Sequence, residues 1–275
     1  MYTEKLVDLH MHSNASDGIN SPTELLKMAD RAGLSAVGLT DHDTVKGLPE
    51  AFKAAEQCNL ELVPGVEISV MEDKKEIHIL GYYPRDRERL NADLEDIRAE
   101  RYRRMGKIVD KLKKLGFKVK LEEVLAKAGD SAPGRLHLAR IMLQKKYVHS
   151  INEAFSLYLN PDRGAHVPRR LLTLKRAMEL LTGVRSVRVI AHPGALGKDI
   201  IERLMPLGLQ GIEVFHPDHS AAQIKFYYEM AIEKGLLVTG GSDYHGDRER
   251  TSGYPTRLAI EGQYLDRLKE AASKT

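Results

Sequence analysis

The feature that most constrains the fold is an alternation of short apolar segments with amphipathic helices, in which almost every apolar segment ends in a histidine or an acid. Apolar runs bounded by turn residues are typical of strands, and their alternation with helices predicts a parallel α/β architecture. The expected strands are residues 5–12, 36–42, 60–70, 76–83, 187–192, 211–216 and 237–243. A set of about seven strands is enough to close a barrel.

The helices between these strands have recognisable ends. Ser21 and Glu24 have the spacing of a capping box, Pro22 suits the first turn, and Gly33 ends this helix. Further helices are expected over 48–59, 200–207 and 220–234 and near Leu265.

The alternation stops between residues 86 and 170, where the chain becomes helical, polar and basic. We expect one long helix over 87–115 and shorter helices near Leu121, Arg135 and Ile151. The predicted organisation is a barrel domain made of residues 1–85 and 171–275, with a helical insertion subdomain of residues 86–170.

Composition limits the class of protein. The 275 residues are 42% hydrophobic and 29% charged, which excludes a disordered or fibrous chain. The single cysteine, Cys58, cannot form an internal disulfide, and no apolar run reaches the roughly 18 residues that span a bilayer. We therefore expect a cytoplasmic protein that does not contact membranes. A net charge of only +3 gives no support for binding duplex DNA.

Histidines and acids recur at or near the ends of the predicted strands. They are His10, His12, Asp17, His42, Glu67, His78, His192, Asp243 and His245. In a parallel barrel the carboxyl ends of the strands meet at one mouth, so these side chains are expected to gather there. A set of six imidazoles and three carboxylates is too large for one tetrahedral zinc, which takes about four ligands. The pattern therefore predicts two or three metal ions.

Seven segments carry a resemblance to a known family. They are DLHMHSNASDG, GLTDHDTVKG, PGVEIS, HILGYY, AHPG, GIEVF and GGSDYHGD, and together they cover nearly the whole chain outside the insertion. In order and spacing they resemble the polymerase and histidinol phosphatase (PHP) domain family, which is related to the amidohydrolases. The resemblance implies a distorted seven-stranded β/α barrel, a trinuclear metal site and phosphoesterase activity.

The same resemblance implies how the ligands are shared among three divalent ions of manganese, iron or zinc. One ion would be held by His10, His12, Glu67 and Asp243, a second by Glu67 with His78 and His192, and a third by Asp17, His42 and His245. Glu67 and Asp243 are thus catalytic through the metals that they hold.

A charge count supports phosphate chemistry independently. Three divalent ions, opposed by three carboxylates and a bridging hydroxide, leave a net charge of about +2, which a phosphomonoester dianion neutralises. Metals bring the pKa of bound water towards about 7, so the hydroxide is the expected nucleophile.

Other residues are candidates for contact with substrate. His219 is expected either to contact phosphate or protonate the leaving oxygen, or to cap the helix that begins at Ser220. Arg135 opens a helix after Pro133 and Gly134 and is a candidate anchor for a phosphate that is not cleaved. Arg104 lies in the basic stretch 98–120 and is a second candidate. Surface positions are expected for His137, His149 and His166.

The expected activity is hydrolysis of phosphate monoesters on small nucleotides, preferably 3′,5′-nucleoside bisphosphates. The alternatives are 5′ to 3′ exonuclease action on short RNA, a monoesterase like the histidinol phosphatases, and a metal-binding module without activity. The last is disfavoured because all nine ligand positions hold competent residues. The sequence predicts no particular oligomeric state.

Overall fold

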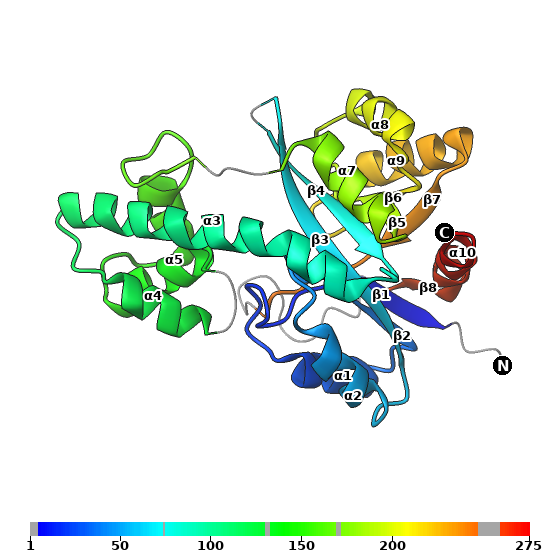
Figure 1. Cartoon of the computed structure of the whole chain (residues 1–275), viewed down its shortest axis with the longest axis horizontal. Coiled ribbons are helices and arrows are strands. Elements are labelled where there is room, and N and C mark those ends of the chain that lie inside the picture. The colour runs from blue at the N-terminus through cyan, green and yellow to red at the C-terminus, as the bar shows by residue number, and fades with distance from the viewer. Residues whose placement is uncertain (1–4, 74, 130–132, 169–171, 247–258) are drawn as a thin grey trace. The chain divides into compact units, whose positions relative to one another are not determined.

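The structure is a computed structural model that describes residues 5–73, 75–129, 133–168, 172–246 and 259–275. The chain divides into two compact units, Met1–Leu94 with Leu172–Thr275, and Glu95–Leu171 (Figure 1). The second unit begins later than residue 86 because the first turns of helix α3 (Arg87–Lys114) belong to the first unit. Leu90 and Leu94 in these turns are fully buried. We call the two parts the barrel unit and the insertion unit.

The barrel unit is built on one eight-stranded sheet with the order β7-β6-β5-β4-β3-β2-β1-β8. The strands are β1 (Leu6–Met11), β2 (Ala36–Leu39), β3 (Glu61–Glu72), β4 (Lys75–Tyr82), β5 (Val187–Ile190), β6 (Gly211–Phe215), β7 (Leu237–Gly240) and β8 (Ile260–Glu261). The predicted α/β barrel is confirmed. The short strand β8, antiparallel to β1, was not expected from the sequence.

The expectation of an all-parallel barrel is wrong at β4. This strand pairs antiparallel with both β3 and β5, and β3 and β4 form a long hairpin. Only residues 73 and 74 separate the two strands, which are too few for the crossover helix that a parallel connection requires. As a consequence Glu67 and His78 lie within the hairpin, with Ser69 paired to His78, rather than at strand ends.

The first and last segments of the barrel unit meet beside β1. The Asp243 amide donates to His10 O at 2.9 Å and the His12 amide donates to Tyr244 O at 3.0 Å. Gly241 makes this approach feasible, because a Cβ placed there would lie only 2.4 Å from the His10 nitrogen. The chain that follows β7 is therefore held against the end of β1.

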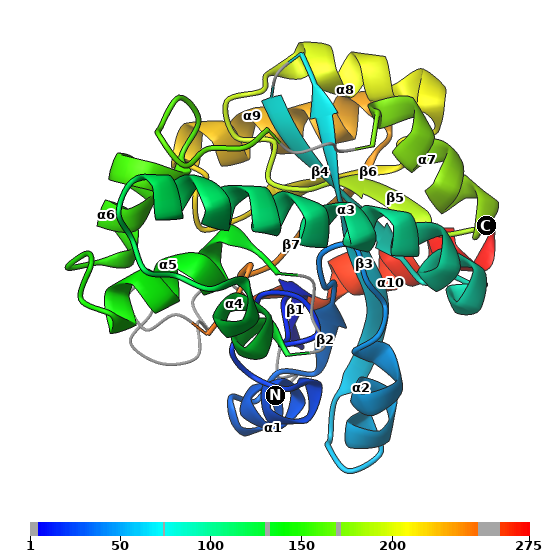
Figure 2. The same cartoon turned by 60° about the vertical axis from the view of Figure 1, so that its left-hand side comes forward.

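Helices cover two opposite sides of the barrel unit, as Figures 1 and 2 show. One side carries α1 (Pro22–Arg31) and α2 (Leu48–Ala55), and the other carries α7 (Leu174–Gly183), α8 (Lys198–Leu204) and α9 (Ala221–Lys234). Helix α10 (Gly262–Ser273) packs on β1, β5 and β7. The capping box at Ser21 and Glu24 is confirmed. Helix α7 was not expected, although Thr173 caps it through the Arg176 amide.

The insertion unit has its own hydrophobic core, to which Met105, Leu112, Leu138 and Met142 contribute. Its elements are the rest of α3, α4 (Leu121–Ala128), α5 (Arg135–Gln144), α6 (Ile151–Ala154) and the π-helical turn Phe155–Leu159. Within the described residues, no helix of either unit is long and apolar enough to cross a membrane.

Candidate metal centre

The centre starts at the end of β1, where His10 and His12 point to the same face because side chains alternate along a strand. Both rings are fully buried, and their Nε2 atoms lie 3.0 Å apart. Asp243, brought beside β1 by the contacts described above, places Oδ1 3.0 Å from His12 Nε2. Two imidazoles and a carboxylate thus converge on one small volume.

Glu67 lies at the middle of the cluster and is fully buried. Its Oε1 is 2.8 Å from His78 Nδ1 and 3.1 Å from His192 Nε2. Its Oε2 is 3.1 to 3.2 Å from ring nitrogens of the other neighbours, which are His10, His12 and His42. One carboxylate therefore faces five imidazoles, as expected of a group that bridges two ions.

A third group of metal-donor atoms lies at the loop that follows β1. Asp17 Oδ1 is 3.3 Å from His245 Nε2. Donor atoms of Asp17 and His245, together with those of His12 and His42, all lie within 4.8 Å of one another. The structure thus brings all nine predicted ligand residues into one cluster. Two of its groups contain the predicted sets around Asp17 and Asp243, whereas Glu67 and His78 group with His42, and His192 groups with His216 and Asp243.

Two further residues belong to the cluster and were missed. Glu213, in the middle of β6, is fully buried and accepts from His10 Nδ1 at 2.9 Å and from the His192 amide at 2.8 Å. His216 Nε2 lies 3.5 Å from Asp243 Oδ2. The sequence signal for Glu213 is an acid inside the apolar run Gly-Ile-Glu-Val-Phe. His216 ends the same segment, directly before Pro217.

Electrostatics couples these groups tightly. Burial opposes ionisation of Glu67, but the charges of His42 and His78 outweigh burial and hold its pKa well below the usual range. Burial likewise disfavours a charged His12, yet hydrogen bonds to Asp243 and Glu67 raise its pKa to about 10. Burial lowers the pKa of His42 to about 3. In the described part of the chain, every ion pair of Glu67 and Asp243 is with an imidazole, so the carboxylates depend on cations that no Lys or Arg supplies.

The donor set fits divalent metal ions. Several buried donor atoms of the cluster make no well-oriented hydrogen bond although some lie close to another ligand atom, namely Nδ1 of His12 and His42, Nε2 of His78 and His216, and Oδ1 of Asp17 and Asp243. A buried polar atom without a partner costs about 1 to 3 kcal/mol, which coordination would offset. Mixed imidazole and carboxylate donors suit manganese, iron and zinc.

His219 lies at the same end of the sheet, but the main chain engages both of its ring nitrogens. Nδ1 donates to Val214 O at 2.8 Å, and Nε2 accepts from the Gly194 amide at 3.1 Å. Burial lowers its pKa, which favours the neutral ring that this pattern requires. Tyr227 Oη donates to Gly194 O at 2.9 Å. These contacts hold the turn that follows His192.

Arg104 and Arg135 both belong to the insertion unit. Arg104 Nε donates to Val167 O at 2.8 Å, and Arg135 Nη1 donates to Leu159 O at 3.3 Å. Burial lowers the pKa of His166, and the charges of Arg104 and Arg135 lower it further, so both arginines lie near this imidazole. The structure corrects the surface position expected for His137, which is buried and accepts from the Gly134 amide at 3.1 Å.

The fold and the clustered donors define the class: an α/β-barrel hydrolase that depends on metal ions. A model of the PHP domain matches residues 8–184, and the chain belongs to this family. The protein is therefore a metal-dependent hydrolase that acts on phosphoesters.

Three relatives have different named activities. A 5′-3′ exoribonuclease of Haemophilus influenzae is 34% identical over 248 residues, covering 88% of this chain and 90% of the relative. A 3′,5′-nucleoside bisphosphate phosphatase of Chromobacterium violaceum is 32% identical and covers 88% of both chains. A phosphoribosyl 1,2-cyclic phosphate 1,2-diphosphodiesterase of Eggerthella lenta is 31% identical, covering 87% of this chain and 94% of the relative.

A solved structure agrees with the fold. The crystal structure of a putative metal-dependent phosphoesterase from Bifidobacterium adolescentis superposes with a TM-score of 0.88 at 26% identity, covering 96% of each chain.

Proposed function

We propose that the protein removes phosphate from small nucleotides and prefers 3′,5′-nucleoside bisphosphates. The observation that carries this proposal is the single carboxylate of Glu67 among five imidazoles, flanked by the donor groups around Asp17 and Asp243. Such overlapping groups suit three divalent ions close together, and a dianionic terminal phosphate complements their charge. The Chromobacterium relative, named a bisphosphate phosphatase, supports the choice of substrate.

The residues have distinct parts in this proposal. His10, His12, Glu67 and Asp243 would hold one ion, Glu67 with His78 and His192 a second, and Asp17, His42 and His245 a third. Manganese, iron or zinc bound there would activate water near neutral pH and offset charge on the phosphate oxygens. Glu213 accepts from His10 Nδ1, so the lone pair of His10 stays on Nε2, directed at the cluster.

The geometry assigns His219 a positioning role. A ring that donates to Val214 O and accepts from Gly194 N has no nitrogen left for a phosphate or a leaving group. Its hydrogen bond to Gly194, two residues after His192, instead orients that ligand. This replaces the phosphate contact and the helix cap expected from the sequence, since Ser220 itself caps α9.

Arg104 and Arg135 remain the proposed anchors for a second phosphate. Both lie near His166. Arg104 Nε and Arg135 Nη1 each donate to a main-chain carbonyl, which holds both guanidinium groups in place. Two positive charges in one neighbourhood suit the phosphate that is retained on a bisphosphate substrate.

A second candidate is 5′ to 3′ exonuclease action on short RNA, favoured by the relative from Haemophilus influenzae. The same metal chemistry serves a diester when the nucleotide to be released is at the end of the chain.

One assay tests the proposal and its alternative. Manganese-loaded protein is offered a 3′,5′-bisphosphate of adenosine, 5′-AMP and a short 5′-phosphorylated RNA, with Glu67→Gln as the control. We expect fastest release of inorganic phosphate from the bisphosphate. Faster release of mononucleotides from the RNA would instead establish the exonuclease. Rates equal to those of Glu67→Gln on all substrates would refute both.

A further inference from the structure

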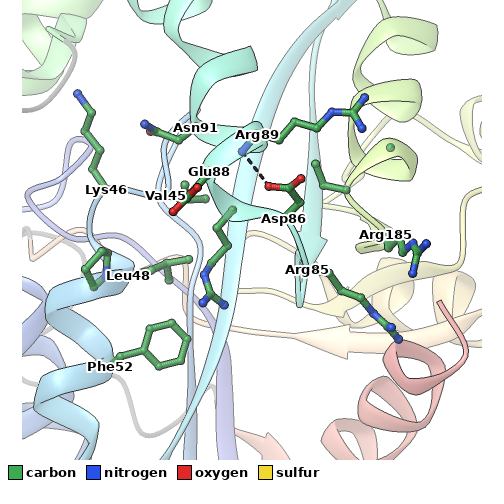
Figure 3. Close-up of a pocket in the computed structure, with 14 residues that line it drawn as sticks. Val45, Lys46, Leu48, Phe52, Arg85, Asp86, Glu88, Arg89, Asn91 and Arg185 are labelled. Atoms are coloured by element: carbon green, nitrogen blue, oxygen red, sulfur yellow. Dashed lines mark hydrogen bonds between the residues drawn. The ribbon is translucent and has the colours of Figure 1, made fainter.

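A cleft in the barrel unit lies apart from the metal donors. It has a volume of about 1040 Å³, which is ample for a nucleotide, and none of the residues that line it belongs to the metal cluster. Its walls come from the loop before α2, from α2 itself, from the start of α3 and from the turn after α7 (Figure 3). We call it the α2–α7 cleft.

The lining of the cleft is strongly cationic. Its basic residues are Lys46, Arg85, Arg87, Arg89 and Arg185, against the two acids Asp86 and Glu88. One carboxylate oxygen of Asp86, Oδ1, already accepts a hydrogen bond from the Arg89 amide at the start of α3. Lys46 and Arg185 make no ion pair with any described residue. Arg89 Nε lies 3.8 Å from Asp93 Oδ2, and Arg85 Nη2 donates to Ala272 O at 3.1 Å, so Lys46 and Arg185 carry the charge most available to an anion.

An aromatic ring lies across the cleft from two of these basic residues. Phe52 extends into the cleft from α2, while Arg85 and Arg185 lie on the other side (Figure 3). The ring is 36% exposed, and the Arg87 guanidinium carbon sits 4.9 Å from its centroid. A planar cation stacked on an aromatic ring is a surface on which a nucleobase also stacks.

The backbone at Arg185 gives an independent observation. Val184 is the C-cap of α7, and Arg185 follows it in a left-handed conformation with φ of 54°. Glycine is usual at this position because a Cβ is unfavourable there. The local backbone thus does not favour a side chain at this position, and the side chain of Arg185 lines the cleft.

We propose that the α2–α7 cleft binds a nucleotide unit, with the base against Phe52 and Arg87 and the phosphate at Arg85 and Arg185. The unit is either a free nucleotide or one residue of an RNA chain. Lys46 follows His42 by four residues, so this edge of the cleft lies within roughly 14 Å of a metal donor. Binding of a nucleotide in the cleft is independent of the proposed hydrolytic activity.

The chain contains no tryptophan, so a single one reports on a single place. In Phe52→Trp the new indole lies in the cleft; in the matched control Phe226→Trp it lies on α9, where Phe226 is 43% exposed. The ligands are 5′-AMP, inorganic phosphate and a hexaribonucleotide with a 5′-hydroxyl and phosphorothioate linkages, added to manganese-loaded protein.

We expect saturable fluorescence quenching in Phe52→Trp by 5′-AMP, by the RNA or by both, and none in Phe226→Trp. Quenching by 5′-AMP identifies a free nucleotide, and quenching by the RNA alone identifies a chain. Adding Arg185→Gly to Phe52→Trp should raise the apparent Kd about tenfold or more, the loss of one charge-assisted contact. The glycine suits the local backbone, so the fold should persist.

Three results would overturn the proposal: no saturable quenching by any ligand, equal quenching in both tryptophan variants, or an unchanged Kd with Arg185→Gly. Displacement of 5′-AMP by inorganic phosphate of equal affinity would also overturn it, because the base would then contribute nothing. If Phe52→Trp does not fold, equilibrium dialysis of labelled 5′-AMP gives the same comparison. At nucleotide concentrations near the Kd of the unaltered protein, Arg185→Gly should then bind less labelled 5′-AMP per chain. Phosphate release by Arg185→Gly tests the proposed function separately.

Discussion

The substitution Glu213→Gln tests whether a residue outside the ligand set governs metal binding. The carboxylate accepts two hydrogen bonds, one from His10 Nδ1 at 2.9 Å and one from the His192 amide at 2.8 Å. Glutamine has one acceptor oxygen, so its NH₂ group must face one of these donors. If it faces the His192 amide, a buried donor is left unpaired. If it faces His10, the ring must move its proton to Nε2, the atom needed for the metal.

The magnitude follows from these two outcomes. An unpaired buried donor costs about 1 to 3 kcal/mol, and loss of the group that orients a metal-bound histidine typically lowers metal affinity about 10 to 100-fold. Because Glu213 touches His10 directly and His192 through its amide, we expect the upper part of that range, about 50-fold or more.

Manganese affinity is measured by competition with a chelator of known affinity, beside circular dichroism to verify the fold. Glu202→Gln, on α8, is the control and should bind metal like the unaltered protein. Affinity within about twofold of the unaltered protein in a folded Glu213→Gln would refute the role of Glu213 in fixing the His10 tautomer.

Three further predictions rest on other parts of the structure. Glu67→Gln should lower turnover at least about a hundredfold with loss of bound metal, whereas Asp17→Asn should lower it less because Asp17 belongs to one donor group. The control Glu61→Gln, at the other end of β3, should not change turnover. Equal small losses of turnover at positions 67 and 17 would reject the bridging role of Glu67. Arg135→Ala should lower kcat/KM for a bisphosphorylated nucleotide by a factor that corresponds to about 1.5 to 3 kcal/mol of transition-state stabilisation, and should leave kcat/KM for a simple monophosphate ester unchanged. Equal losses on both substrates would show that Arg135 does not bind the retained phosphate. Gly241→Ala should lower the free energy of unfolding in urea by at least about 1 to 3 kcal/mol, since its Cβ would lie 2.4 Å from the His10 nitrogen. Gly106→Ala in α3, where the nearest contact is 3.8 Å, should instead raise it by up to about 1 kcal/mol, so a matched loss would contradict the steric argument.

Much of the fold and the cluster could be predicted because the signals were local. Alternating segments located most strands, and His10 with His12 shared a face by strand geometry alone. The apolar run of β4 does not show its direction, but the few residues between the expected strands 60–70 and 76–83 are too short for a crossover helix and do indicate a hairpin. The place of Glu213 in the cluster was not predicted, because it depends on contacts with His10 and His192, which are distant from Glu213 in the chain. The hydrogen bonds of the His219 ring with Val214 O and the Gly194 amide likewise depend on tertiary structure and could not be predicted from the sequence.

The contact between the two ends of the barrel unit has a consequence for folding. His10 and His12 precede the insertion in the chain, and Asp243 and His245 follow it, yet they lie side by side at one seam. An ion held by His12 and Asp243 would cross-link positions that enclose most of the chain. Such a link restricts the unfolded ensemble as a disulfide does, and the entropy it removes grows with the length of the enclosed loop. A protein with one cysteine would thus obtain through coordination the long-range constraint that secreted proteins obtain through sulfur.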